Sequence, residues 1–304
     1  MRVRVAVACA ITAVVCVAIA APAAGGATDY PVPYNFGAGI AAELVSPGSS
    51  PPGSNDWTCR PSTAHPYPVV LAHGTFGDMT NSWQALSPLL ANNGYCVFAL
   101  DYGGSPGNPI QAYGPIETSA AQLSQFVDRV RSATHAPKVD IVGHSQGGMM
   151  PRYYMKFLGG APKVHTLVGL APSNHGTNLF GLVDLLRAFP SGSQFDNSLC
   201  EACSQQTAGS PFLTNLNAGG DTIAGVNYTV IETRYDEVVT PYTSAFLSGR
   251  KVTNITLQDQ CPIDFADHLA VIYDSVALRD VLNALDPAHA LAPQCVPVFP
   301  VLGG

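Results

Sequence analysis

One short segment restricts the possible folds of this chain more than any other. The residues Gly143-His-Ser-Gln-Gly147 stand between a β-branched run, 139–142, and a stretch typical of a helix, 148–158. A chain that passes directly from a strand into a helix needs a sharp turn, and residues without a Cβ allow it. The segment therefore predicts a strand, a tight turn and a helix, with the hydroxyl of Ser145 standing clear of the backbone at the turn.

The same alternation of apolar strands and helical segments runs along most of the chain. It is typical of an α/β fold in which a mostly parallel sheet carries helices on both faces. Ligands of such sheets bind at the carboxyl ends of the strands. Strands are expected over residues 67–72, 96–100, 139–142, 165–170, 228–233 and 252–257, and helices over residues 82–91, 117–132, 148–158 and 266–285.

The first 27 residues have the composition of a secretory signal peptide. Arg2 and Arg4 precede an apolar run over residues 5–20, and small residues follow as a cleavage site. A membrane anchor is the alternative, but the run is short for a span and its small-residue exit favours cleavage. A lipid anchor is not expected, because Val15 precedes Cys16. We expect a secreted, extracellular protein with one domain over residues 28–304.

Charge narrows the possible partners. The chain is only 12% charged and 47% hydrophobic, which suits a compact globular protein and argues against disorder. Without its first 27 residues it keeps all 21 acidic residues and loses two of its 14 basic ones, for a formal charge of −9. That charge argues against nucleic acid and anionic membrane surfaces as partners. No stable protein partner is implied.

Six cysteines follow the expected signal peptide. An even number in an oxidising compartment predicts three disulfides, whose pairing the count alone leaves open. The Cys-x-x-Cys spacing at 200–203 is also found in zinc and redox sites, but no further zinc ligands are evident nearby, so a local disulfide is favoured. The six residues are Cys59, Cys96, Cys200, Cys203, Cys261 and Cys295.

If Ser145 is a nucleophile, it needs two partner residues, because a serine hydroxyl is a poor nucleophile at neutral pH. It needs a histidine base, and the base needs an orienting carboxylate. After Ser145 the chain offers Asp236, just past the strand expected over 228–233, and then His268, in a loop after the last strand. The order serine, acid, histidine and the strand-end positions fit a catalytic triad.

Other residues compete for the two partner roles. Glu237 is the alternative acid, because it neighbours Asp236. Asp264 and Asp267 are expected to be loop or helix-capping groups, since an orienting acid normally comes from another strand end. Three other histidines are less suitable as the base because of their positions in the chain: His144, His175 and His289.

The tetrahedral intermediate of such a reaction needs two preorganised N–H donors. The backbone N–H of Gln146, which follows the serine at the start of the helix, is expected to be one of them. The second is expected in the loop over residues 73–77, after the first strand. Thr75 fits best, because its hydroxyl adds a third donor, and Phe76 is the alternative.

Five spaced segments of the chain resemble the secreted class 2 bacterial lipases of the α/β-hydrolase superfamily. The serine followed by Gln-Gly-Gly, with residues 205–210 and 217–220, also resembles lipases of the Candida antarctica lipase B type. The five segments are Ala72-His-Gly-Thr-Phe-Gly77, Gly143-His-Ser-Gln-Gly-Gly148, Ala171-Pro-Ser-Asn-His-Gly-Thr177, Arg234-Tyr-Asp-Glu-Val-Val239 and Asp267-His268.

The resemblance implies a triacylglycerol lipase that works through an acyl-enzyme, with Ser145, Asp236 and His268 as its triad. It implies oxyanion donors at Thr75 and Gln146, an acylglycerol or other ester as substrate at a lipid–water interface, and no metal or organic cofactor. A short-chain esterase, an acyltransferase or a polyester hydrolase with the same triad is the alternative. The disulfide pairs that the resemblance implies are Cys59–Cys96, Cys200–Cys203 and Cys261–Cys295.

Two features are not explained by the resemblance, and a third segment has two possible roles. His73 stands where the lipase B pattern has a proline, and Pro151 lies inside the expected helix, where it predicts a kink. Residues 178–189 are apolar nearly all round. They predict a helix that either lines the acyl pocket as a wall or lid, or lies buried in the core.

Overall fold

The computed structural model describes residue 1 and residues 29–178, 181 and 200–304. The expected signal peptide lies outside the described residues, as does nearly all of the apolar segment 178–189. Among the described residues, none of the helices combines the length and hydropathy that a membrane crossing requires.

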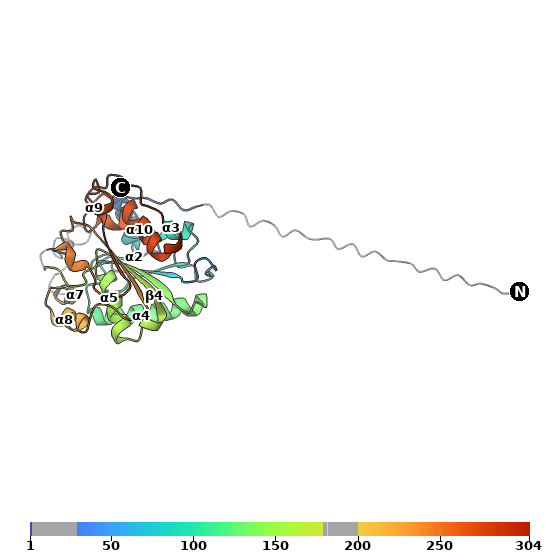
Figure 1. The fold of residues 1–304 in the computed structure, drawn as a ribbon, viewed down its shortest axis with the longest axis horizontal. Helices are drawn as coiled ribbons and strands as arrows, with labels where there is room; N and C mark the ends of the chain where they lie inside the picture. Colours follow the sequence, from blue (N-terminus) through green and yellow to red (C-terminus); the bar gives the residue numbers. More distant parts are fainter. Residues whose placement is uncertain (2–28, 179–180, 182–199) are drawn as a thin grey trace.

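The centre of the molecule is a six-stranded sheet in which all paired strands run parallel (Figure 1). Its spatial order is β2-β1-β3-β4-β5-β6. Every residue of β1, β2 and β3 is buried, which is why β1 and β2 are continuous apolar runs and β3 is mostly apolar, with Asp140 and His144 as buried polar residues. β6 lies at the edge and is partly exposed. The strands are β1 (Val69–Ala72), β2 (Val97–Leu100), β3 (Val139–His144), β4 (Val164–Leu170), β5 (Asn227–Glu232) and β6 (Val252–Thr256).

Helices cover both faces of the sheet. Figure 1 shows α4 and α5 on one side of it and α2, α3 and α10 on the other. The helix α5 packs on α4, β3 and β4, while α10 packs on β4 and β5. The α-helices are α1 (Phe36–Val45), α2 (Met79–Ser82), α3 (Leu86–Asn92), α4 (Ile116–Thr134), α5 (Gln146–Phe157), α7 (Glu201–Gln205), α8 (Pro211–Asn217), α9 (Leu257–Gln260) and α10 (Ser275–Leu285), and the 3-10 helices are η1 (Ala161–Lys163), η4 (Tyr242–Ala245), η5 (Ala270–Tyr273) and η6 (Pro287–His289).

The helix expected over residues 82–91 is wrong as a single element, because the structure has two short helices, α2 and α3, in its place. Pro88 gives the physical reason. It has no N–H to donate to the carbonyl of Gln84, and its ring would clash with that carbonyl in a continuous helix. The other expected elements are present within a few residues of their expected ends, although residues 266–269 are loop and helical structure starts at Ala270.

The turn between β3 and α5 depends on two glycines. A Cβ on Gly143 would lie 1.9 Å from the carbonyl oxygen of Gly147, and one on Gly147 would lie 2.1 Å from that of Ala72. A larger residue at either position would displace the backbone. Between them Ser145 has φ 53° and ψ −120°, a conformation that non-glycine residues rarely adopt. The sharp turn expected from the sequence is therefore present.

Pro151 does not end the helix that follows this turn, since α5 continues to Phe157. The carbonyl that would accept a helical hydrogen bond from residue 151 is that of Gly147. This oxygen lies against Gly143, so the bond that the proline removes falls at the tight contact of the turn.

The order of the strands places a binding site at one point of the sheet. From β1 the chain crosses to β2 on one side, and β3 then pairs with the other side of β1. The loops that leave the carboxyl ends of β1 and β3 therefore lead away in opposite directions, and ligands of parallel sheets commonly bind at such a point. Residues 73–77 and Ser145 follow these two strands.

The three disulfides of the structure have the pairing that the resemblance implies. Two of them join a loop to the end of a strand or helix, at Cys96 and Cys261, and the third joins Cys200 to Cys203 at the start of α7. The pairs are Cys59–Cys96, Cys200–Cys203 and Cys261–Cys295.

Candidate active site

Three residues that are far apart in the sequence lie at the carboxyl end of the sheet. Ser145 directly follows β3, Asp236 lies in the loop after β5, and His268 lies in the loop between α9 and η5. Ser145 has no exposed surface, and neither do the side chains of Asp236 and His268. Any reaction at this point would take place away from bulk water.

The carboxylate of Asp236 binds the ring of His268. Asp236 Oδ2 lies 2.7 Å from His268 Nδ1, and its other oxygen accepts the backbone N–H groups of Val238 and Val239 at 2.8 and 2.7 Å. Because a carboxylate oxygen accepts, Nδ1 carries the proton of the neutral ring. Nε2 of His268 is then left with a lone pair, as a general base requires.

The other acids near His268 have different partners. Glu237 Oε2 accepts the backbone N–H of His268 at 3.3 Å, so it supports the loop and not the ring. Asp264 and Asp267 accept backbone N–H groups at 2.8 Å within the same stretch of chain, which is the loop and capping role expected for them. The geometry thus favours Asp236 over Glu237 as the acid.

The side chain of His144 forms a hydrogen bond with the backbone of His268. Its Nε2 lies 2.9 Å from the backbone carbonyl oxygen of His268, so this nitrogen donates. Burial, and after it the charge of His268, hold the pKa of His144 well below its ordinary value, and the ring stays neutral. The sequence predicts only that His144 packs beside the strand, and its contact with His268 is an addition from the structure.

Burial and neighbouring charges shift the pKa values of the groups around Asp236 and His268. Burial lowers the pKa of His268, but the charge and the hydrogen bond of Asp236 outweigh it, and the net pKa is raised. Glu232, at the end of β5, is fully buried. Burial, and then the charge of Asp236, raise the pKa of Glu232 well above its ordinary value. A neutral Glu232 adds no second negative charge beside Asp236.

The side chains of Ser145 and His268 are not hydrogen-bonded to each other in this structure. Within the described residues, Ser145 Oγ and His268 Nε2 are both buried and neither has a hydrogen-bond partner. The hydrogen bond between the two side chains therefore has to form during the reaction.

The two expected oxyanion donors are neighbours. Thr75 Oγ1 donates to Gln146 Oε1 at 2.7 Å, although the residues are 71 positions apart. Gln146 is the first residue of α5, so its backbone N–H has no acceptor within the helix. Phe76 fits the role less well, because its backbone N–H donates to the carbonyl of Gln111 at 2.9 Å.

Sequence reasoning missed one further side chain at this place. Gln206 is fully buried, and its Nε2 lies 2.8 Å from Thr75 Oγ1 and 3.1 Å from Gln146 Oε1. Its only signal in the sequence is that it belongs to the segment 205–210 that resembles the lipase B type.

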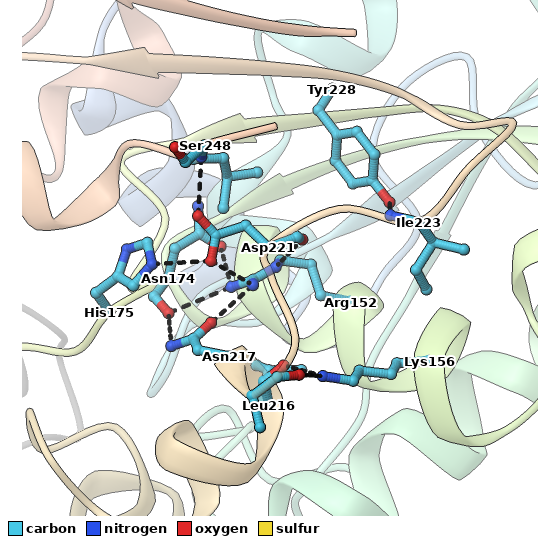
Figure 2. A network of polar contacts seen from close by, with 12 residues as sticks. Arg152, Lys156, Asn174, His175, Leu216, Asn217, Asp221, Ile223, Tyr228 and Ser248 are labelled. Carbon is cyan, nitrogen blue, oxygen red and sulfur yellow. Dashed lines mark hydrogen bonds and ion pairs between the residues drawn. The ribbon is translucent and has the colours of Figure 1, made fainter. Parts of the chain in front are cut away.

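A buried arginine ties the helix α5 to two loops (Figure 2). The guanidinium of Arg152 donates to Asn217 Oδ1 at 2.7 Å and to the backbone carbonyl of Asn174 at 3.3 Å, and it lies 3.5 Å from Asp221 Oδ1. Figure 2 shows Asn174 and Asp221 converging on this one side chain. The loop after β4 and the loop before β5 are thereby fixed to the helix that follows Ser145.

The remaining histidines have partners outside the group of Ser145, Asp236 and His268. His175 Nε2 lies 3.1 Å from Asp221 Oδ1, at the edge of the arginine cluster. His289 is 83% exposed and pairs with Asp286. Their contacts agree with the weaker candidacy that their positions in the sequence indicate.

The parallel sheet, the sharp turn at Ser145 and the strand-end position of Asp236 define an α/β-hydrolase fold. The crystal structure of Aspergillus fumigatus lipase B aligns with 81% of this chain and 57% of its own, with a TM-score of 0.58 and 20% identity. At that identity the likeness concerns the fold alone. It confirms the fold class expected from the sequence.

The chain belongs to the class 2 lipase family, whose sequence model matches residues 66–279. A triacylglycerol lipase of Pseudarthrobacter phenanthrenivorans is 30% identical over 133 residues, which are 41% of this chain and 39% of that protein. One of Burkholderia plantarii is 30% identical over 133 residues, 41% of this chain and 35% of its own length. The matched region thus spans less than two fifths of each relative.

Proposed function

We propose that this protein is a secreted serine ester hydrolase, with triacylglycerols as its principal substrates. The observation that carries the proposal is the buried pair of Asp236 and His268, joined at 2.7 Å beside the strained turn of Ser145. Membership of the class 2 lipase family and the two triacylglycerol lipases among its relatives support the choice of substrate. No metal or organic cofactor has a step in this reaction.

The reaction has two halves. His268 Nε2 takes the proton of Ser145 Oγ as that oxygen attacks the ester carbonyl carbon, and the carbonyl oxygen becomes an oxyanion. The intermediate collapses, the C–O bond to the alcohol breaks, and the alcohol leaves with the proton from His268. Water then attacks the acyl-enzyme, again giving its proton to His268, and the fatty acid leaves as Ser145 regains its hydrogen.

The other groups stabilise the charges of these steps. Asp236 orients the ring and favours the imidazolium form of His268. The oxyanion accepts from the backbone N–H groups of Gln146 and Thr75 and from the Thr75 hydroxyl. Because these donors are fixed in a buried site, little reorganisation is needed when the charge develops.

The first test is Ser145→Ala against the unchanged protein. Hydrolysis of p-nitrophenyl butyrate should fall by about 10⁴-fold or more, while the thermal unfolding temperature stays nearly the same. Covalent labelling by a fluorophosphonate probe should disappear in the variant. Turnover retained by Ser145→Ala at the rate of the unchanged protein would refute the assignment of the nucleophile.

The second test concerns the substrate. Initial rates with emulsified triacylglycerols and with p-nitrophenyl esters of increasing chain length separate a lipase from its alternatives. A lipase gains rate on emulsified long chains, whereas a short-chain esterase loses activity as the chain grows. An acyltransferase would form a new ester with an added alcohol. A polyester hydrolase would clear a polyester emulsion.

Secretion and domain organisation are part of the proposal. Three disulfides agree with folding in an oxidising compartment, and the N-terminal composition agrees with a signal peptide. Residues 28–304 would be the mature hydrolase domain. Mass spectrometry of protein collected from the medium should show an N-terminus between residues 22 and 28, and recovery of the full-length chain in the membrane fraction would contradict cleavage.

A further inference from the structure

Gln206 joins the two oxyanion residues from a third part of the chain. It follows α7 directly and has no exposed surface. Its amide nitrogen lies 2.8 Å from Thr75 Oγ1 and 3.1 Å from Gln146 Oε1. The triad does not use this residue, and neither expected oxyanion donor belongs to its segment.

The orientation of the Gln206 amide is fixed by its surroundings. Ser173 Oγ donates to Gln206 Oε1 at 2.7 Å, which turns the NH2 group toward Thr75. The backbone of Gln206 is held as well, because its N–H donates to Ala202 at 3.0 Å and its carbonyl accepts the N–H of Thr177 at 2.9 Å. The Cys200–Cys203 disulfide braces the short helix just before it. The side chain is therefore a preorganised donor.

In this structure the proton of the Thr75 hydroxyl is already used in a hydrogen bond. Thr75 Oγ1 donates it to Gln146 Oε1 at 2.7 Å. A hydroxyl has one proton, so it must rotate before it can donate to an oxyanion. Rotation alone would leave a buried amide oxygen without its donor, which costs free energy.

Gln206 removes that cost. Its amide nitrogen has two hydrogens and three acceptors near it, of which Thr75 Oγ1 and Gln146 Oε1 are nearer than the carbonyl oxygen of Ala202 at 3.2 Å. The amide hydrogen that points to Thr75 Oγ1 fills an acceptor position of the hydroxyl. The hydroxyl's own proton can then point to a third group. The hydrogen toward Gln146 Oε1 keeps that oxygen bonded when the Thr75 proton turns away.

We propose that Gln206 is a positioning residue of the oxyanion hole, which aims the Thr75 hydroxyl at the oxyanion and replaces it as the donor to Gln146. The inference rests on the proposed function, because it concerns the same reaction. It assigns Gln206 no contact with substrate. Gln206 acts only through the Thr75 hydroxyl, so replacing Gln206 should have no further effect on kcat once that hydroxyl is removed.

The test is a double-mutant cycle between Gln206 and Thr75 on p-nitrophenyl butyrate. Thr75→Val removes the hydroxyl but keeps the backbone N–H, and kcat should fall by about 10²-fold, as for loss of one oxyanion donor. Gln206→Leu should lower kcat by about 10-fold or more with KM nearly unchanged, because the hydroxyl acts only on the oxyanion. The double variant should match Thr75→Val alone within about threefold.

A purely structural role for Gln206 predicts different results. In that case the two losses multiply in the double variant, or Gln206→Leu lowers the unfolding temperature and leaves kcat intact. Either result would overturn the inference. Activity of the unchanged protein, lost in Ser145→Ala, is measured beside the cycle, so failure of the proposed function is recognised separately from failure of this proposal.

A second variant keeps the test valid if Gln206→Leu does not fold. Ser173→Ala removes the donor that fixes the Gln206 amide but leaves the glutamine in place. It should lower kcat by a few fold in the unchanged background and have no effect when Thr75 is valine. An equal loss in both backgrounds counts against the proposal.

Discussion

Replacing Asp236 by asparagine gives the sharpest test of the candidate site. The new side chain has the same shape and can still accept the N–H groups of Val238 and Val239 through its oxygen. Its NH2 group would then face His268 Nδ1, which also carries hydrogen. The ring must change tautomer to avoid two facing donors, and Nε2 loses the lone pair that accepts the proton of Ser145.

The size of the effect follows from the distance between the two groups. Unit charges 2.7 Å apart attract by about 6 kcal/mol at an effective dielectric constant of about 20. The imidazolium of His268 forms only during the reaction, so this attraction stabilises the transition state more than the free enzyme. At 1.36 kcal/mol per factor of ten, Asp236→Asn should lower kcat by about 10⁴-fold.

The assay is steady-state hydrolysis of p-nitrophenyl butyrate over a range of pH, with Glu237→Gln as the matched control. The control keeps an oxygen to accept the backbone N–H of His268, and its kcat should stay within about tenfold of the unchanged protein. In Asp236→Asn, the largest charge that opposes burial is lost, which lowers the pKa of His268 although Glu237 and Asp267 remain nearby. The acid limb of the residual kcat/KM should therefore move to lower pH.

Two results would refute this reasoning. One is that Glu237→Gln loses activity while Asp236→Asn retains it, which would make Glu237 the acid. The other is that Asp236→Asn is nearly inactive but has an unfolding temperature many degrees below that of the control. The loss would then reflect damage to the buried loop and not to the base.

Three predictions concern stability. Burial, and then the neighbouring carboxyl group of Asp78, raise the pKa of Glu43 from 4.5 to about 8. The folded protein therefore binds a proton that the unfolded chain loses, and its stability falls as pH rises between these values. Urea unfolding should show Glu43→Gln gaining roughly 2 kcal/mol on the unchanged protein between pH 5 and pH 9, once solvent screening is allowed for. Arg152→Met leaves the carboxylate of Asp221 without its guanidinium and should cost about 3 kcal/mol in the same assay, and a loss below the error of the measurement would contradict the buried network. Opening Cys261–Cys295 by serine at both positions releases a loop of 34 residues and should cost about 4 kcal/mol, which calorimetry without reductant would detect as a lower unfolding temperature.

The parts of the site that could be predicted from the sequence are those that depend on residues close together in the chain. The β3–turn–α5 unit has its mostly apolar strand, its glycines and its serine within about 20 residues, and a parallel strand that is buried on both faces has to be largely apolar. Asp236 and His268 could be selected because each follows an expected strand, and parallel strands bring their carboxyl ends to one edge of the sheet.

The supporting contacts could not be predicted in this way. Gln206 meets Thr75 across 131 positions, and His144 meets the carbonyl of His268 across 124. Glutamine and histidine at such distances leave no periodicity, because a single side-chain hydrogen bond places no requirement on the neighbouring residues. The break between α2 and α3 is different, since Pro88 is visible in the sequence and its effect on a helix is local.

One feature near the site suggests how it could be altered by exchange of a whole segment. The end of the described range 29–178 is joined to residues that follow shortly after position 200. Thr177 pairs with Thr207 in a parallel bridge, and its N–H and carbonyl bind the backbone of Gln206 and Ala208 at 2.9 and 3.0 Å.

Because both flanks are fastened at one place, Thr177 and residues 206–208 are fixed attachment points, and a segment exchanged between them can be treated as a cassette. A flexible replacement would be closed by the protein body whatever its length, and each doubling of length adds only about 0.6 kcal/mol of closure entropy. Segments taken from other members of the family could therefore be inserted between these points while Ser145, Asp236 and His268 keep their positions. Such chimaeras would separate what the cassette contributes to substrate choice from what the sheet contributes to chemistry.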